Sequence, residues 1–408
     1  MIEISNLRLQ KGEEWTKVVV DIKSDVARVD KEDTMWVAVK NEEAAMLNDE
    51  TYDAFLCLPV YLAMYYNTDL RIHGFVSNIL YHNVKRYVQS VLKYFKDGMK
   101  EINIIVDGFK EVEKNEGNIV GTGISCGVDC LQTLYDNYYK EEDEDYKVNR
   151  LFIFNCGWNG DYDNPNTYQY FIDCANSRQY AADDLNLPVS LVDSNLHAFL
   201  PNLGDQSSYF NLYTCAFALE KGLSKYYISS SYSYRDVLRI GYKSRNIDFS
   251  EFGDPLVIPL LRSKKMELIS DGCQYDRTEK TERIVNWEIT KKHLNVCCRN
   301  DNKENCSVCS KCIRTLLALE AMDILDDYKG LFNIDAYKKH SFLFKCKMVL
   351  AGKEGENGFL SDLYRFYKLK NKKLPPYIIA FTVAMTYLWP KTVLIIINRK
   401  LINRKKVK

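Results

Sequence analysis

The chain has 408 residues, of which 46% are apolar and 27% are charged. This composition is typical of a folded globular protein and excludes a disordered one, and the length allows two domains or one large domain with additions. The 55 basic and 55 acidic residues balance. No overall charge therefore attracts nucleic acid or an anionic membrane, and such binding would need a local patch.

The first 115 residues alternate short apolar runs with helical patterns, which predicts an N-terminal α+β domain over residues 1–115. The charged, glycine-ended stretch 111–117 is a candidate boundary. The predicted strands are 16–22, 34–39 and 102–106, and the predicted helices are 54–66 and 76–94.

From residue 116 the pattern becomes a regular strand–helix alternation, which predicts an α/β domain with a doubly wound parallel sheet over residues 116–330. Four of the five residues 151–155 are apolar, as expected for a strand covered on both faces. The predicted strands are 118–124, 151–155, 187–192 and 226–229, and the predicted helices are 128–139, 168–185, 210–221 and 312–322.

A glycine-rich turn separates the first strand of this domain from its helix. Gly123 and Gly127 allow a ligand to approach the backbone closely, and backbone N–H groups at a helix start can face an anion. Ser125 offers a hydroxyl, and Asp129 could orient a metal ion. The segment lacks the lysine of the G-x4-GK[ST] loop and the spacing of the dinucleotide fingerprint. Its plainer interpretation is an ordinary tight turn.

Four cysteines in the spacing C-x8-C-x2-C-x2-C predict a zinc site. They are Cys297, Cys306, Cys309 and Cys312, and the alternative first ligand is Cys298. Four thiolates leave zinc no open coordination position, so the expected role is structural. The 13 cysteines show metal spacing rather than a disulfide pattern, and residues 1–6 show no secretion signal, so we expect a cytoplasmic location.

The segment Ser125-Cys-Gly-Val-Asp-Cys130 resembles the SGGxDS motif of the PP-loop (N-type) ATP pyrophosphatases, the adenine nucleotide alpha-hydrolase-like enzymes. The cysteine spacing, with Arg314 two residues later, is similar to the zinc knuckle of their 7-cyano-7-deazaguanine synthase branch. The resemblance covers about residues 118–325 and places the knuckle at 297–314. It implies a Rossmann-like fold with ATP, magnesium and zinc.

The resemblance also implies roles for individual residues. The catalytic residues it implies are Ser125, Asp129 and Arg314. The nucleotide-binding residues it implies are Gly123, Ser125, Cys126, Gly127, Val128, Asp129, Cys130, Asn155 and Ser230. Two of these positions depart from the family, because Cys126 replaces a glycine and Cys130 a serine. A thiol donates hydrogen bonds poorly, so ATP turnover could be slow or absent.

Three functions follow as hypotheses. The first is an ATP-dependent ligase that adenylates a carboxylate or amide oxygen, releases pyrophosphate and transfers a nitrogen nucleophile, with a peptide or protein among the open substrates. The second is a tRNA-modifying, thiolating enzyme, against which the balanced charge counts. The third is a degenerate nucleotide-binding or scaffold protein, which Cys126 and Cys130 favour.

Residues 331–408 are predicted to form a helical extension with a basic tail. The stretch 377–397 is strongly apolar and is interrupted by Pro390 and Lys391, and six of the ten residues 399–408 are Lys or Arg. A buried or dimerising helix pair, a weak membrane anchor and an RNA contact stay open for this segment, and a homodimer stays open for the chain.

Overall fold

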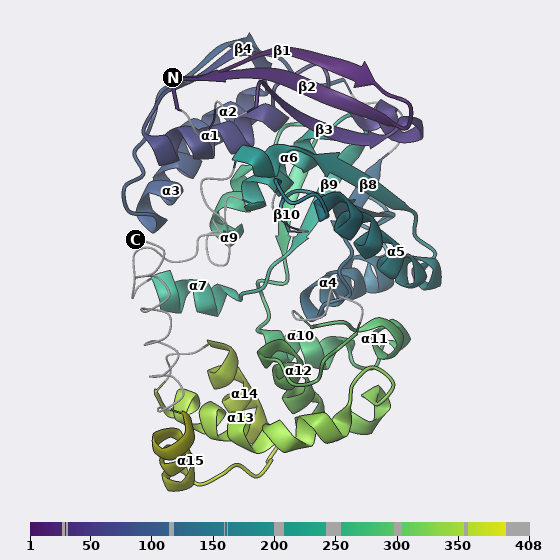
Figure 1. Cartoon of the computed structure of the whole chain (residues 1–408), viewed down its shortest axis with the longest axis vertical. Helices are drawn as coiled ribbons and strands as arrows, with labels where there is room; N and C mark the ends of the chain where they lie inside the picture. The colour runs from purple at the N-terminus through teal and green to yellow at the C-terminus, as the bar shows by residue number, and fades with distance from the viewer. Residues whose placement is uncertain are drawn as a thin grey trace. The chain divides into compact units, whose positions relative to one another are not determined.

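The computed structural model describes residues 1–26, 29, 32–113, 118–158, 160, 162–199, 208–241, 254–297, 304–354 and 358–388. It divides the chain into two compact units, Met1–Tyr275 and Asp276–Lys408 (Figure 1). This division differs from the three predicted domains, whose boundaries fell near residues 115 and 330. The cysteine cluster therefore belongs to a different unit from the glycine-rich turn.

The first unit is built on one ten-stranded sheet in the order β10-β9-β6-β7-β8-β3-β2-β1-β4-β5. Six of its nine strand pairs are parallel and three are antiparallel. The strands are β1 (Ile2–Lys11), β2 (Trp15–Ser24), β3 (Thr34–Lys40), β4 (Leu70–Val76), β5 (Ile104–Phe109), β6 (Ile119–Gly123), β7 (Arg150–Phe154), β8 (Val189–Ser194), β9 (Leu223–Ser229) and β10 (Glu267–Asp271).

The half of the sheet formed by β6 to β10 is entirely parallel. The chain runs from β6 outward through β7 to β8, and then returns to place β9 and β10 on the other side of β6. The strand order therefore reverses beside β6, which is the pattern of a Rossmann-like sheet, and it confirms the predicted α/β class. In such sheets ligands bind beyond the carboxyl ends of the strands at the point of reversal.

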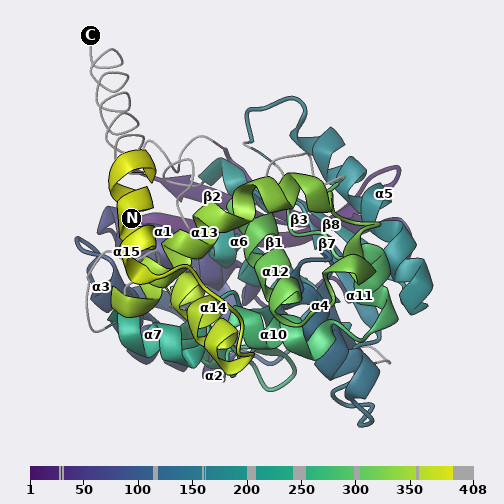
Figure 2. The same cartoon turned by 90° about the horizontal axis from the view of Figure 1, so that it is seen from below.

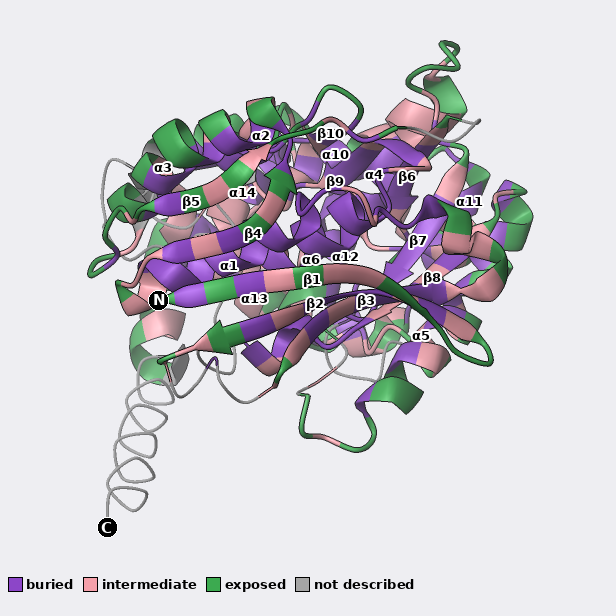
Figure 3. Ribbon diagram, turned by 90° about the horizontal axis from the view of Figure 1, so that it is seen from above, coloured by how far each residue is buried: buried purple, intermediate pink, exposed green. Residues whose placement is uncertain are grey.

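The N-terminal strands extend this same sheet. β3 pairs antiparallel with β8, with Val37 opposite Ser194, and β2 and β1 follow antiparallel. The predicted N-terminal α+β part is therefore joined to the α/β part by backbone hydrogen bonds, and the whole sheet is mixed rather than parallel. Figure 3 shows the burial along the strands, with exposed residues alternating along the edge strand β5.

Helices cover both faces of the sheet. α1 and α6 share one hydrophobic core with Phe152 and Phe154 of β7. Leu151 and Ile153 alternate with them, so they face the other side, where α5 contacts β7 and β8 and α4 contacts β6 and β9. The helices of this unit are α1 (Ala54–Tyr66), α2 (Asn78–Asn83), α3 (Gln89–Phe95), α4 (Val128–Leu134), α5 (Thr167–Leu185), α6 (Ser208–Ala218), α7 (Tyr234–Gly241) and α9 (Asp254–Val257).

Helix α1 is the most deeply buried helix of the predicted set. Every residue from Ala54 to Met64 is buried, because the helix is apolar on all sides and packs against β1, β4 and α6. The predicted helix 76–94 is interrupted by a π-helical turn at Val84–Val88, and the predicted helix 128–139 ends in a π-helical turn at Tyr135–Lys140.

The second unit is helical within its described residues (Figure 2). Its first helix begins with a capping box in which Asp276 and Glu279 exchange hydrogen bonds with each other's backbone. The helices are α10 (Arg277–Ile284), α11 (Glu288–His293), α12 (Ser310–Ala321), α13 (Ile334–Glu354), α14 (Gly358–Leu369) and α15 (Tyr377–Val383), which continues as a π-helical turn over Ala384–Leu388.

All helices in the described part of the chain fall short of the length and apolar content that a membrane crossing requires. The described part of the predicted apolar stretch 377–397 ends at Leu388, and its remainder and the basic tail lie outside the described residues.

Candidate functional site

The glycine-rich turn lies at the carboxyl end of β6, where the strand order reverses. β6 ends at Gly123, and α4 begins at Val128 with Gly127 as its extended N-cap. Among the described residues, no side chain caps this helix start. Because the N-cap residue is a glycine, it offers no side-chain acceptor to the start of α4, and the N–H groups of a helix start favour an anion.

The strand behind the turn is packed too tightly for a side chain at one position. A Cβ atom at Gly121 would overlap the ring of Phe152 and lie 3.2 Å from Leu223. The glycine thus lets β6 pack closely against its neighbours. The turn that follows β6 is therefore held in place by a tightly packed strand. Val128 is fully buried, whereas Ser125 is exposed.

Both substituted cysteines are folded into the turn. Cys126 has a φ of 58°, in the left-handed region that favours glycine, which fits the glycine that the resembled motif has there. The Cys130 sulfur accepts from the Ser125 N–H at 3.3 Å and donates to the Gly123 carbonyl at 3.3 Å. Burial raises the pKa of Cys126 to about 12 and also raises the pKa of Cys130. Both are therefore neutral thiols near pH 7 and poor nucleophiles.

A buried hydrogen bond ties α4 to the far strand β10. The Thr133 hydroxyl donates to the Asp271 carboxylate at 2.7 Å, and both residues are buried. The backbone N–H of Ser230 donates to the Asp271 carbonyl at 2.8 Å. The Ser230 hydroxyl donates to the Tyr232 carbonyl at 2.9 Å, so this predicted ligand residue is engaged in its own loop. The sequence did not indicate this pair of residues. The strand that carries Asp271, β10, has five residues of which only two are apolar, and so short a pattern does not predict a strand.

The ends of β7 and β8 are also joined by side chains. Asn155 donates its amide N–H to Asp193 at 2.7 Å, and Ser194 donates its hydroxyl to the Asn155 carbonyl at 2.7 Å. The amide oxygen of Asn155 is buried and accepts no hydrogen bond from the described residues. Burial raises the pKa of Asp193. Asn155 thus presents an unused acceptor at the edge where the turn also lies.

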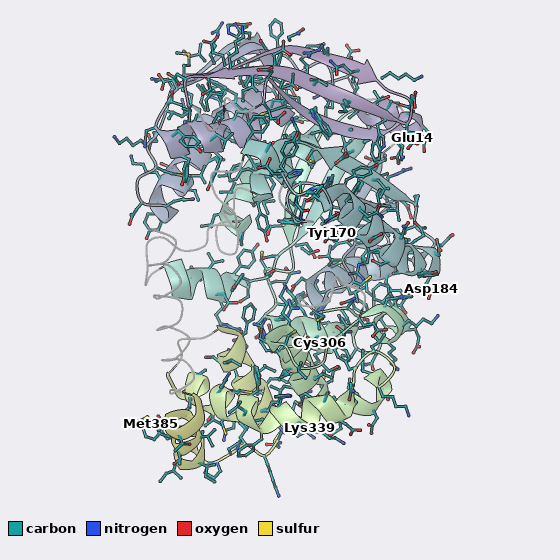
Figure 4. The ribbon with its side chains drawn as sticks, viewed as in Figure 1. Glu14, Tyr170, Asp184, Cys306, Lys339 and Met385 are labelled. Atoms are coloured by element: carbon teal, nitrogen blue, oxygen red, sulfur yellow. The ribbon has the colours of Figure 1, made fainter. Side chains whose placement is uncertain are left out.

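In the second unit the four cysteine sulfurs of the predicted zinc site come together. The sulfurs of Cys297, Cys306, Cys309 and Cys312 all lie within 4.8 Å of one another, and Figure 4 labels Cys306. Four sulfurs at zinc-bonding distance from one ion are about 3.8 Å apart. The Cys306 and Cys312 sulfurs are 4.0 Å apart. The group could therefore hold a metal ion such as zinc. Cys298, the alternative ligand, lies outside the described residues.

Backbone N–H groups and one asparagine hold the cluster in place. The N–H of Cys309 donates to the Cys306 sulfur at 3.4 Å, and the N–H of Cys312 donates to the Cys309 sulfur at 3.5 Å. The Asn305 side chain accepts from the Val296 N–H at 2.8 Å and donates to the Leu294 carbonyl at 2.8 Å. These bonds join the segment that carries Cys297 to the segment that carries the other three cysteines. These supporting bonds orient the ligands before metal binding. The cysteine spacing did not reveal Asn305.

Arg314 lies in the second turn of α12, and its guanidinium stacks over the Phe359 ring at 4.2 Å. Its Nε donates to the Ser310 carbonyl at 3.2 Å. It lines a small cleft that holds about one water-sized volume, 10 Å³, together with Arg277 and Thr281. The predicted catalytic set is thus divided between the units, with Ser125 and Asp129 in the first and Arg314 in the second.

No family model matches the chain, and neither a curated protein nor a solved structure matches it. The described geometry therefore carries the functional argument alone. It brings together Gly123 to Cys130 in one turn, places Asn155 and Ser230 at the ends of strands in the same sheet, and groups the four cysteines.

Proposed function

We propose that the protein is an ATP-dependent enzyme of the PP-loop class that adenylates a carboxylate or amide oxygen. One observation carries the proposal: the turn with the motif-like sequence Ser125–Cys130 lies at the carboxyl end of β6, beside the reversal of strand order. The carboxyl end of a strand at the point of reversal is where a Rossmann-like sheet binds nucleotides. A glycine turn without a binding role would not be expected at this point in preference to any other.

The residues of the turn fit a bound pyrophosphate group. The N–H groups at the start of α4 and the exposed Ser125 hydroxyl would donate to phosphate oxygens. Asp129, half-buried in the first turn of α4, would orient magnesium, which neutralises phosphate charge. Donors fixed by the fold lower the barrier because they need no reorganisation as charge develops.

The reaction follows from this placement. The substrate oxygen forms a bond to the α-phosphorus of ATP, the bond to the β-phosphate breaks, and pyrophosphate leaves with its electron pair. A nitrogen nucleophile then attacks the activated carbon, and AMP leaves. The neutral, buried thiols of Cys126 and Cys130 count against the thiolating alternative, since neither is poised to attack.

Calorimetry with ATP and magnesium, followed by pyrophosphate release assays with candidate acids and amides, tests the proposal. We expect ATP binding in the wild type and a loss of at least about tenfold in affinity for Ser125→Ala, which removes one phosphate donor. Ser341→Ala is the matched control, because this exposed hydroxyl bonds only the Lys338 carbonyl of its own helix. Absence of ATP binding in the wild type would refute the proposal.

A second candidate, a nucleotide-binding protein without turnover, is favoured by one contact. The Cys130 thiol is engaged with the Ser125 N–H and the Gly123 carbonyl, which removes a donor that the resembled motif directs at phosphate. The double reversion Cys126→Gly with Cys130→Ser separates the two candidates. A large gain of turnover supports the binding protein, whereas unchanged or lower turnover supports the enzyme.

A further inference from the structure

The C-terminal helix α15 and the turn after it have two apolar faces, of which only one is covered. Ala380 is fully buried and packs with Cys346 and Val349 of α13 and with Val383 of its own helix. On the other side Ile378, Phe381 and Met385 are 73%, 49% and 42% exposed. Their spacing of three and four residues places them on one helical face, and Figure 4 labels Met385 at the end of this segment.

The polar groups of this outer face are already satisfied within the helix. The Thr382 hydroxyl donates to the Ile378 carbonyl at 2.8 Å, and the Thr386 hydroxyl donates to the Thr382 carbonyl at 2.8 Å. The threonines therefore need no outside partner. A surface whose hydroxyls are bonded to its own backbone loses little when it leaves water for an apolar medium.

Charge in this part of the chain is one-sided. Residues 363–408 contain 12 of the 55 Lys and Arg residues and none of the 55 Asp and Glu residues, which leaves 43 basic against 55 acidic residues in 1–362. Arg365, Lys370 and Lys372 pair with acidic residues of the second unit. Seven of the other basic residues lie in 389–408, beside the apolar run Val393–Ile397.

We propose that the exposed face of Tyr377–Leu388 binds the surface of a lipid bilayer that carries anionic headgroups, to which the basic residues that follow in the sequence are attracted. The exposed face of α15 supplies apolar contact with the acyl boundary, and the basic residues supply attraction to the headgroups. Membrane binding through the apolar face alone or through the basic residues alone is weak, whereas binding through both together is stable. The proposal is independent of the ATP reaction proposed above.

Two other occupants fit the same observations less well. A second copy of the chain would bring two segments of like charge together, which disfavours pairing through this face. A nucleic acid would pair its phosphates with the basic residues, but it would leave the aliphatic side chains of Ile378 and Met385 exposed to water.

Flotation of the full-length protein with vesicles tests the proposal. One set of vesicles contains phosphatidylcholine alone, and the other also contains phosphatidylglycerol. We expect partition into the anionic vesicles at low salt, weak partition into the neutral ones, and release as salt rises, because salt screens the headgroup attraction.

Two variants separate the apolar and charged contributions. The double variant Ile378→Asp, Met385→Asp lowers partition at least about tenfold, since two apolar contacts are lost. The triple variant Arg404→Ser, Lys405→Ser, Lys406→Ser lowers it on the order of a hundredfold. Phe342→Asp on α13 is the control, because this side chain is 53% exposed outside the proposed face, and its partition stays unchanged.

Three outcomes would overturn the inference. The first is no partition into anionic vesicles at low salt, with circular dichroism showing the wild type folded. The second is equal partition into neutral and anionic vesicles. The third is a dimer, or a complex with RNA, that Ile378→Asp dissociates in ultracentrifugation while vesicle binding is absent.

Discussion

The glycine-rich turn and the cysteine cluster are both short cysteine-containing segments next to a helix start, yet they depend on different parts of the chain. The cluster is defined by four side chains from two segments that are close in sequence, and the Asn305 side chain links these segments by hydrogen bonds. The turn is defined by its backbone, and its position depends on a sheet in which paired residues are up to 157 positions apart in sequence, as Val37 and Ser194 are.

The cysteines in the two regions also have opposite relations to their surroundings. In the cluster the sulfurs face one another and could share a metal ion. In the turn the Cys130 sulfur faces the backbone and links Ser125 to Gly123. The sulfurs of the cluster could thus bind a metal ion, whereas the Cys130 sulfur forms hydrogen bonds with the backbone of the turn.

The largest effect is expected in the cluster. Cys309→Ala should abolish stoichiometric zinc and unfold the second unit near its metal site, because structural zinc contributes roughly 10 kcal/mol or more to such small sites. Metal analysis by mass spectrometry and thermal unfolding measure the two consequences.

The control for this variant is Cys346→Ala, which removes a buried thiol of the same unit outside the cluster. It should keep zinc and lose only about 1 kcal/mol of stability. A Cys309→Ala protein that keeps one zinc per chain, or that loses zinc without losing stability, would contradict a structural metal site.

The second prediction concerns thiol reactivity. Because burial raises the pKa of Cys126 to about 12, its thiolate fraction at pH 8 is about a thousandfold below that of an ordinary thiol with a pKa near 9. Alkylation should therefore spare Cys126, and its rate should rise with pH up to about pH 12 while the fold persists. A chelator should expose the cluster cysteines to alkylation and leave Cys126 unchanged. Peptide mapping that finds Cys126 alkylated as fast as a free thiol would contradict this.

Much of the site could be predicted from the sequence because its signals are local. The strand, turn and helix around Ser125 and the cysteine spacing are each read within about 20 residues. What the sequence could not show is pairing between distant segments. β10 is a strand because Leu268 and Ile269 pair with β9, and β3 joins the α/β sheet because Val37 pairs with Ser194. The local sequence pattern of a strand does not show which distant strand it pairs with. The predicted boundary at residue 115 therefore fell between strands of one continuous sheet.

The third prediction tests the rigid support of the turn. Gly121→Val should destabilise the first unit by about 3 kcal/mol, because its side chain would overlap the Phe152 ring, and the neighbours cannot move without opening the sheet. Gly330→Val is the control, since no atom lies within 4 Å of a Cβ placed there. Chemical denaturation measures both. Equal stability of the two variants would show that the sheet near β6 is looser than its packing indicates.

The smallest effect is expected at the link between α4 and β10. Thr133→Val keeps the side-chain shape and removes the hydroxyl that donates to Asp271 at 2.7 Å. Since a buried hydrogen bond to a charged group contributes about 1.5 kcal/mol, we expect a loss of that size. Thr133→Ser retains the donor and should recover most of it.

The same pair of variants shows whether this link also serves the turn. Asp271 accepts the Ser230 N–H through its carbonyl, so the carboxylate bond to Thr133 fixes two segments that flank the point of strand reversal. If α4 is held for nucleotide binding, Thr133→Val should weaken ATP affinity measured by calorimetry beyond what partial unfolding explains, and Thr133→Ser should restore it. If Thr133→Val loses stability while its ATP affinity is unchanged, the hydrogen bond serves the fold and not the site. The turn would then differ from the cluster only in depending on its own backbone.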